Sequence, residues 1–365
     1  MGALMASFVV LTTAGLGAAS WREAAKGYEF SFPRDHASHP DYKIEWWYYT
    51  GNLAAQDGRR FGYQVTFFRV GIDQAPTNPS RWSVRDVFMT HLAVSDVKGQ
   101  RYRYTERLSR GGPGLAGAAS DRYHVWNEAW TASLDERGRH VLRALDEKAG
   151  IDLVLEPGKP AVVNGINGIS QKGAQAGNAS HYYSLTRMPT NGVISIDGER
   201  VEVAGESWMD HEFGTTFLEP DQRGWDWLSI QLADGRELML YQLRRADGSR
   251  DPRSSGTLIE RDGRKTHLGL SDFTLTAGGR TFKASNGAAY PLVWTIAIPS
   301  KMLELRVTTP LENQELSLER SSGVAYWEGL IDVTGNQAGR ALTGRGYLEM
   351  TGYYGSLGRV FSNSR

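Results

Sequence analysis

The stretch that decides the fold is EWWYYTGNLAAQDGRRFGYQV, residues 45–65, because a diverged copy of it occurs later in the chain. The copy is GWDWLSIQLADGRELMLYQL, residues 224–243. Aligning Trp46 with Trp225 also aligns Tyr48 with Trp227, and a small gap then superimposes two Asp-Gly-Arg turns. The offset is 225 − 46 = 179 residues, about half of the 365-residue chain. Two copies of one β-hairpin at this spacing predict two β-domains of similar size.

Short alternating apolar runs bounded by turn residues fill much of the remaining chain, as in VFMTHLAVSD (87–96) and GVISIDGERVEVAG (192–205). This pattern is typical of antiparallel strands. We therefore expect an all-β protein with two tandem antiparallel β-barrels of eight to ten strands each, over residues 21–215 and 216–365. The best window of helical periodicity is short and covers residues 137–146.

The overall composition excludes several classes of function. Lys plus Arg and Asp plus Glu both total 41, so the formal net charge is zero. Nucleic acid or an anionic membrane surface as the main partner calls for a basic footprint, which is missing here. The chain has no cysteine, which excludes disulfides, thiolate catalysis and cysteine-based zinc sites.

The first 19 residues, MGALMASFVVLTTAGLGAA, carry no charge and end in small residues. This pattern predicts an export signal over residues 1–20 and a periplasmic or secreted protein, although no Lys or Arg precedes the apolar stretch. A permanent anchor helix is the alternative, but its threonines and glycines make it weakly hydrophobic for a membrane span.

The aromatic run KIEWWYYTG (43–51) should form a strand with two different faces. Glu45 and Trp47 face one way, whereas Trp46 and Tyr48 face the other. An ordinary strand that is buried on both sides explains the tryptophans adequately. It does not explain Glu45, which needs a partner or a raised pKa if it points inward.

The segment SWMDHEFG (207–214) places three ionisable side chains among aromatic residues. In an extended strand, Asp210 and Glu212 share one face and His211 lies on the other. These three groups cannot converge on one metal ion without a bulge, and no His-Glu-x-x-His motif is present, so no metal is expected. The chain also lacks a Gly-x-Ser-x-Gly nucleophile elbow. The segment is then either an acid–base catalytic site or a buried cluster of polar groups with a purely structural role.

Five segments together resemble a known family: HPDYKIEWWYYTGNL, HYYSLTRM, GESWMDHEFG, GWDWLSIQLADGRELMLYQLR and GRGYLEMTGY. They are similar to the AttH/carotenoid 1,2-hydratase-like lipocalin family, from about Tyr42 to Tyr354. The resemblance implies two lipocalin-like barrels. Some members hydrate an isoprenoid double bond, and bacterial members are often described as secreted hydrolases. The family resemblance is strong support for the fold and weak support for the identity of the substrate.

Hydration of an isoprenoid double bond needs a proton donor and a stabilised carbocation, but no cofactor. A carboxylic acid kept protonated by an apolar pocket can supply the proton, and aromatic faces can stabilise the cation. We expect Asp210 to be the acid, with His211 or Glu212 orienting water. The expected ligand-binding residues are Glu45, Trp46, Trp47, Tyr48, His91, Tyr183, Trp208, Trp225, Trp227 and Tyr241.

Two alternatives remain open from the sequence. One is a carrier of a lipid or another hydrophobic small molecule, in which Asp210, His211 and Glu212 form a polar lock between the barrels. The other is a lipid ester hydrolase. In each case we expect a hydrophobic partner, no nucleic acid and membrane association only through ligand exchange. A lone histidine on an apolar strand face, such as His91, is more often a structural residue than a functional one.

Overall fold

The computed structural model describes residues 20–357, with the exception of 79, 81 and 319. The predicted export signal therefore lies outside the described residues, apart from Ser20. In this part of the chain the only helices are two short 3-10 helices, η1 (Arg34–His36) and η2 (Pro299–Lys301). The described residues contain no helix with the length and hydrophobicity needed to span a bilayer. The predicted all-β class is confirmed.

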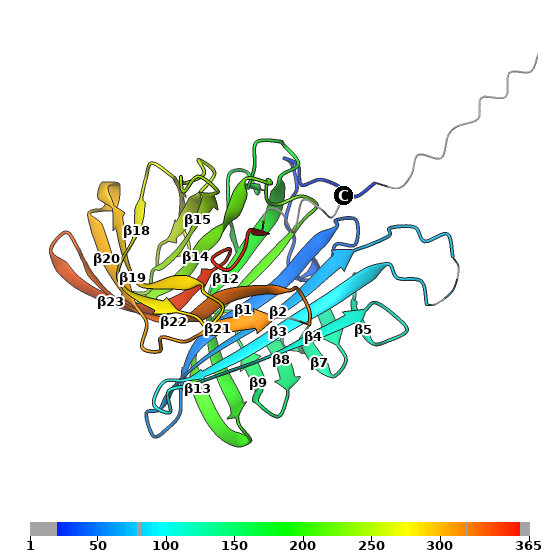
Figure 1. Cartoon of the computed structure of the whole chain (residues 1–365), viewed down its shortest axis with the longest axis horizontal. Helices are drawn as coiled ribbons and strands as arrows, with labels where there is room; N and C mark the ends of the chain where they lie inside the picture. Colours follow the sequence, from blue (N-terminus) through cyan, green and yellow to red (C-terminus); the bar gives the residue numbers. More distant parts are fainter. Residues whose placement is uncertain (1–19, 79, 81, 319, 358–365) are drawn as a thin grey trace, which may run out of the picture.

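The strands form two antiparallel sheets (Figure 1). The first sheet contains β1 (Ile44–Ala54), β2 (Arg60–Gly71), β3 (Asp86–Asp96), β4 (Arg101–Arg110), β5 (Ala116–Ala118), β6 (His124–Asn127), β7 (Trp130–Leu134), β8 (His140–Leu145), β9 (Ala149–Leu155), β10 (Val162–Val163), β11 (Ser170–Gln171), β12 (Ala179–Ile196) and β13 (Glu199–Gly214). The second sheet contains β14 (Gln222–Leu232), β15 (Glu237–Arg245), β16 (Ser255–Ile259), β17 (Lys265–Gly269), β18 (Thr274–Lys283), β19 (Ala289–Ile298), β20 (Leu303–Thr308), β21 (Glu315–Leu318), β22 (Val324–Gln337) and β23 (Arg340–Met350).

The two hairpins that match in sequence occupy the same place in their sheets. β1 pairs with β2 and with the last strand of the first sheet, β13; β14 pairs with β15 and with the last strand of the second sheet, β23. Gly58 and Gly235 in the two Asp-Gly turns have φ of +80° and +88°, a conformation that glycine adopts without the steric cost of a Cβ atom. The chain passes from one sheet to the other between Gly214 and Gln222.

The two sheets differ more than the repeat predicts. The first has 13 strands and forms a nearly closed barrel, in which β3 and β4 contact β6 and β9. The second has 10 strands and forms a half-barrel. The expectation of eight to ten strands in each barrel is therefore wrong for the first sheet. The short window of helical periodicity at 137–146 contains a strand, β8, in which alternate residues are buried.

Each sheet surrounds its own apolar core, and a third cluster joins them. Trp47, Tyr49 and Met209 belong to the core of the first barrel, and Trp294 and Trp327 to that of the second sheet. The third cluster lies between the sheets. Its buried members are Tyr48, Val162, Tyr182, Trp208, Leu218, Trp227, Met239, Tyr241, Leu243, Ile259, Leu330, Tyr347 and Leu357. We call the space around these side chains the inter-sheet site.

Candidate functional site

Strand alternation divides the polar residues of β1 and β13 between two places. Tyr48 lies opposite Asp210, and Asp210 lies opposite Ser184 on β12, so these three side chains share the face that is turned toward the second sheet. Trp47 lies opposite His211 on the other face, inside the first barrel. The side chains of residues 208–213 therefore alternate between the two faces of β13, as the sequence predicted.

Asp210 is buried and surrounded by hydrogen-bond donors. Tyr182 donates to its Oδ2 at 2.5 Å, and Ser184 and the Trp208 indole donate to its Oδ1, each at 2.6 Å. Burial raises the pKa of Asp210 to about 7, because desolvation outweighs these hydrogen bonds, and the charge of Glu212 adds to the rise. A carboxyl with such a pKa exists in both protonation states near neutral pH, as proton transfer requires.

The second sheet contributes two more carboxyl groups to the inter-sheet site, the buried Glu328 and the partly buried Glu349. Glu328 on β22 lies directly opposite Glu349 on β23. Burial raises the pKa of Glu349 to about 7, although the Trp225 indole donates to it at 2.9 Å, and the charges of Asp210 and Glu212 raise it further. Burial, with the charge of Glu349, raises the pKa of Glu328 well above its usual range.

Glu328 differs from the other carboxyls because its buried oxygen atoms have no closely aligned hydrogen-bond donor among the described residues. The one described side chain that interacts with this carboxyl as a hydrogen-bond partner is the buried Tyr48 hydroxyl, which has no closely aligned partner either. Buried polar groups are almost always paired in folded proteins, and the exceptions concentrate at functional sites. These two groups therefore mark the part of the inter-sheet site that is best suited to contact a ligand.

Aromatic rings surround the carboxyls. The rings of Tyr48 and Trp227 meet edge to face at 5.1 Å across the two sheets, and Trp208 meets Trp227 at 6.4 Å. The Trp227 indole donates to the Tyr182 hydroxyl at 3.2 Å and so reaches Asp210 through one intermediary. Such rings provide apolar contact area together with π faces that attract a cation.

A lysine balances part of the negative charge. The Lys172 ammonium lies 3.0 Å from Glu212 and above the rings of Tyr241 and Tyr182, at 4.3 and 5.4 Å. Ser180 donates a short hydrogen bond to the same Glu212 carboxylate. Glu212 therefore has both a cationic partner and a hydrogen-bond donor.

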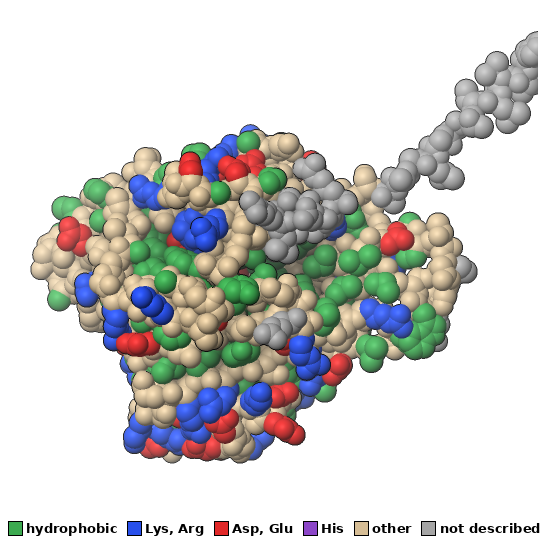
Figure 2. Space-filling model, in the orientation of Figure 1, with side chains coloured by type: hydrophobic (Ala, Val, Ile, Leu, Met, Phe, Trp, Pro, Cys, Tyr) green, Lys and Arg blue, Asp and Glu red, His purple; other side chains and the backbone are tan. Residues whose placement is uncertain are grey.

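A pocket of about 390 Å³ borders the inter-sheet site. It lies between the loop at 165–171 and the segment 252–255, and Tyr241 and Ser170 line its inner end. The hydroxyls of Ser170 and Tyr241 are 3.1 Å apart, and the Lys172 ammonium lies over the Tyr241 ring. Hydrophobic side chains gather in the hollowed middle of the surface in Figure 2. Tyr241 is therefore shared by the pocket and the inter-sheet site.

The predicted site residues fall into three groups. Those inside the first barrel are Glu45, Trp47, Tyr183 and His211; those at the inter-sheet site are Trp46, Tyr48, Trp208, Asp210, Glu212, Trp225, Trp227 and Tyr241; and His91 also lies between the sheets, against Tyr326, outside that cluster. One ligand cannot contact all of them. The three predicted catalytic residues are likewise divided, since His211 faces the barrel and not the carboxyls.

His91 connects the two sheets through hydrogen bonds. Its ring nitrogens lie 2.9 Å from the Tyr326 hydroxyl and 3.0 Å from the Ser321 hydroxyl, which also donates to Glu106. Burial lowers the pKa of His91 to about 3, so the imidazole is a weak base. The Ser321–His91 contact therefore gives little support to an ester hydrolase.

Glu328, Glu349 and Lys172 were not predicted as site residues from the sequence. Glu328 stands in AYWEGL (325–330), where a carboxyl follows three aromatic or small residues, the same kind of signal as in SWMDHEFG. Glu349 belongs to GRGYLEMTGY, a segment that contributed to the family resemblance and was given no chemical role. Lys172 lies in a glycine-rich loop and carries no local signal.

The raised pKa of Glu349 predicts a pH dependence of stability. Between about pH 4.5 and 7 the folded protein keeps a proton on Glu349 that the unfolded chain has lost, so stability decreases as pH rises. The slope is at most about 1.4 kcal/mol per pH unit for one such group. Urea unfolding at pH 5 and 7 should show a larger loss of stability in the wild type than in Glu349→Gln. Equal losses in the two proteins would show that Glu349 titrates normally.

Together, the fold and the site define a lipocalin-like protein of two antiparallel sheets with buried carboxyl groups at their interface. The chain belongs to the AttH-like family, whose sequence profile matches residues 23–353. A crystal structure described as an AttH from Nitrosomonas europaea is similar with a TM-score of 0.81 and 31% identity, over 91% of this chain and 99% of that one.

Two fungal relatives carry names of enzymes that add or remove water. Kievitone hydratase from Nectria haematococca has a similar structure, with a TM-score of 0.68 and 16% identity over 89% of this chain and 94% of that one. Dehydratase asqC from Emericella nidulans is 21% identical over 291 residues, which are 73% of this chain and 77% of that protein. At these identities, the kievitone hydratase structure supports the shared fold.

Proposed function

We propose that this protein adds water to, or removes it from, a hydrophobic unsaturated molecule at the inter-sheet site, without a cofactor. The observation that carries the proposal is a set of three carboxyls, the buried Asp210 and Glu328 and the partly buried Glu349, whose pKa values are all raised by desolvation among aromatic rings. The names of the hydratase and dehydratase relatives support the reaction class. The preferred substrate is one with a trisubstituted isoprenoid-type double bond.

The chemistry can be written with these residues. A protonated carboxyl, Asp210 or Glu349, transfers its proton to one alkene carbon; the π electrons form the new C–H bond and leave a tertiary cation on the other carbon. The faces of Tyr48 and Trp227 stabilise this cation by roughly 0.5–2 kcal/mol each. Water then forms the C–O bond and returns a proton to the carboxylate. Dehydration follows the same steps in reverse, with the carboxyl protonating the hydroxyl that leaves.

A carrier without catalysis is the second candidate, and one observation favours it. Both Asp210 oxygens already accept hydrogen bonds from protein donors, as expected for a polar lock between two sheets. The Glu328 carboxyl favours catalysis instead, because it lacks the closely aligned donors that Asp210 has and, among the described residues, has only the Tyr48 hydroxyl as a hydrogen-bonding neighbour.

The experiment that separates these functions uses isotopically labelled water. Purified protein is incubated in H₂¹⁸O with acyclic isoprenoid alkenes and with the corresponding tertiary alcohols. Enzyme-dependent ¹⁸O incorporation into the alcohol, with no nucleotide or flavin added, is the expected result. Tight binding of the same compounds without any ¹⁸O exchange would establish a carrier.

We also propose that the protein is exported to the periplasm or secreted. The support is the uncharged apolar leader at residues 1–19, followed by Ser20. Expressed in a Gram-negative host, the chain should lose about 19 or 20 residues and appear in the osmotic-shock fraction. Cytoplasmic protein with an intact N-terminus, identified by mass spectrometry, would contradict export.

A further inference from the structure

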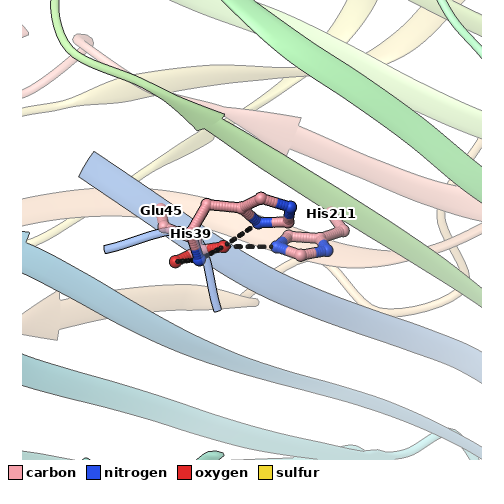
Figure 3. A group of neighbouring side chains, drawn as sticks. All are labelled: His39, Glu45 and His211. Carbon is pink, nitrogen blue, oxygen red and sulfur yellow. Dashed lines mark hydrogen bonds and ion pairs between the residues drawn. The ribbon is translucent and has the colours of Figure 1, made fainter. Parts of the chain in front are cut away.

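The first barrel holds a second cluster of ionisable groups, on the face of β13 opposite the inter-sheet site. It consists of His39, which follows η1, Glu45 on β1 and His211 on β13 (Figure 3). His39 Nδ1 lies 2.8 Å and His211 Nε2 lies 2.9 Å from the same carboxylate oxygen, Oε1 of Glu45. The sequence argument against a metal considered only neighbours of His211 along the chain. The fold brings His39 to it from a different segment.

The remaining polar atoms of the cluster are held by outer partners. Glu45 Oε2 accepts hydrogen bonds from Ser38 at 2.8 Å and from Arg69 at 3.1 Å. Oε1 faces the two imidazoles and also accepts a hydrogen bond from the backbone N–H of His39 at 3.0 Å. A carboxylate oriented in this way by donors on its second oxygen is typical of metal ligands.

Each imidazole also has a partner for its other nitrogen. His211 Nδ1 lies 3.0 Å from the Tyr183 hydroxyl, and His39 Nε2 lies 3.1 Å from the Tyr28 hydroxyl. Asp35 lies 3.5 Å from the same His39 nitrogen. If both rings keep their protons on these outer nitrogens, the inner nitrogens offer lone pairs to an ion. The hydroxyls can accept these protons, since Tyr28 donates to Asp35 and Tyr183 has His36 Nδ1 at 2.6 Å as its own acceptor.

We propose that His39, Glu45 and His211 bind one divalent transition-metal ion, with zinc as the preferred ion. Two imidazole nitrogens and one carboxylate oxygen form a donor set suited to zinc and its first-row neighbours, and less suited to Mg²⁺ or Ca²⁺, which prefer oxygen ligands. Ligand atoms around tetrahedral zinc lie roughly 3.3 Å apart, given bonds of about 2.0–2.1 Å. The three atoms already lie within 4.8 Å of one another, so small side-chain movements suffice.

The ion would tie the N-terminal segment to the barrel. His39 belongs to the segment that packs into the barrel end, where the Trp47 indole donates to the His36 carbonyl at 2.9 Å. Glu45 and His211 belong to two paired strands of the barrel wall. Because the cluster faces away from the inter-sheet carboxyls, metal binding and the proposed reaction can each fail without the other.

The test measures zinc directly on the full chain, after treatment with a chelator. Equilibrium dialysis against micromolar Zn²⁺ should give one ion per chain, and a saturating concentration should raise the Tm by about 5–10 °C. Co²⁺ should give visible d–d absorption of a nitrogen- and oxygen-ligated site. Mg²⁺ and Ca²⁺ at the same concentrations should leave the Tm unchanged.

Two variants and a control assign the ion to the cluster. His39→Gln and Glu45→Gln should each weaken zinc binding by at least about 100-fold, whereas His124→Gln, which changes a partly exposed histidine on β6, should not. Circular dichroism checks that each variant is folded, and His39→Gln is the safer of the two because its side chain is 12% exposed. Fewer than about 0.1 zinc ions per wild-type chain, or unchanged binding in a folded His39→Gln, would overturn the proposal and leave a purely hydrogen-bonded cluster.

Discussion

Replacing Asp210 with Asn, or Glu349 with Gln, should each reduce turnover by at least about 10²-fold while the protein stays folded and binds its ligand. The amides keep the size of the side chains. They also match the hydrogen bonding of the protonated carboxyl, in which one atom donates and the other accepts. What they lack is a proton that can be transferred. Because the pKa of each group is about 7, either group can act as the donor near neutral pH.

Glu202→Gln is the matched control for this pair, because Glu202 is an exposed carboxyl on the same strand as Asp210. It should leave both turnover and ligand affinity unchanged. A stable Asp210→Asn protein with normal turnover would remove Asp210 from the catalytic step and leave it as a structural acceptor for Tyr182, Ser184 and Trp208. Normal turnover in both variants would contradict carboxyl acid catalysis at the inter-sheet site.

Glu45→Ala should be among the most destabilising single substitutions in the first barrel, with a loss of about 3–5 kcal/mol in the free energy of unfolding. Glu45 is fully buried and accepts hydrogen bonds from Ser38, Arg69 and the backbone of His39, as well as facing two imidazoles. Its removal leaves the buried Arg69 with less compensation and several donors unpaired. Urea unfolding in a chelator-containing buffer measures this effect without any contribution from bound metal.

Asp86→Asn provides the comparison, because Asp86 is the other carboxylate that pairs with Arg69, at 2.9 Å, and is 24% exposed. Water can solvate Arg69 in place of the Asp86 carboxylate at that partly exposed position. We therefore expect Asp86→Asn to lower the free energy of unfolding by about 1 kcal/mol or less. If the two substitutions destabilise the protein equally, the network around Glu45 contributes no more than a surface ion pair.

The fold was predictable because its strongest signals are local. A hairpin repeat, Asp-Gly turns and strand alternation depend on neighbouring residues, and the structure has all three. Barrel closure was not predictable in the same way. The 13 strands of the first sheet and the half-barrel of the second depend on how distant edges meet, which no short window of sequence specifies.

The candidate site likewise has features that were predictable from local sequence and features that were not. Alternation correctly separated His211 from Asp210 and Glu212, because it needs only the order of residues on one strand. Glu328 and Glu349 approach Asp210 from a different sheet, more than a hundred residues later in the chain, and His39 approaches His211 from before the first strand. Such contacts follow from topology, so a sequence can present the chemical groups without indicating which of them meet.

The edge-to-face contact between Tyr48 and Trp227 has a consequence for symmetry. The hairpin alignment makes these two residues the same position in two copies of one unit, and each lies opposite a carboxyl on the last strand of its sheet: Asp210 for Tyr48, Glu349 for Trp227. Asp210 and Glu349 are then counterparts in the two copies of the unit, and both have a pKa of about 7. A ligand that lies between the two sheets would meet a carboxyl beside an aromatic ring on either side.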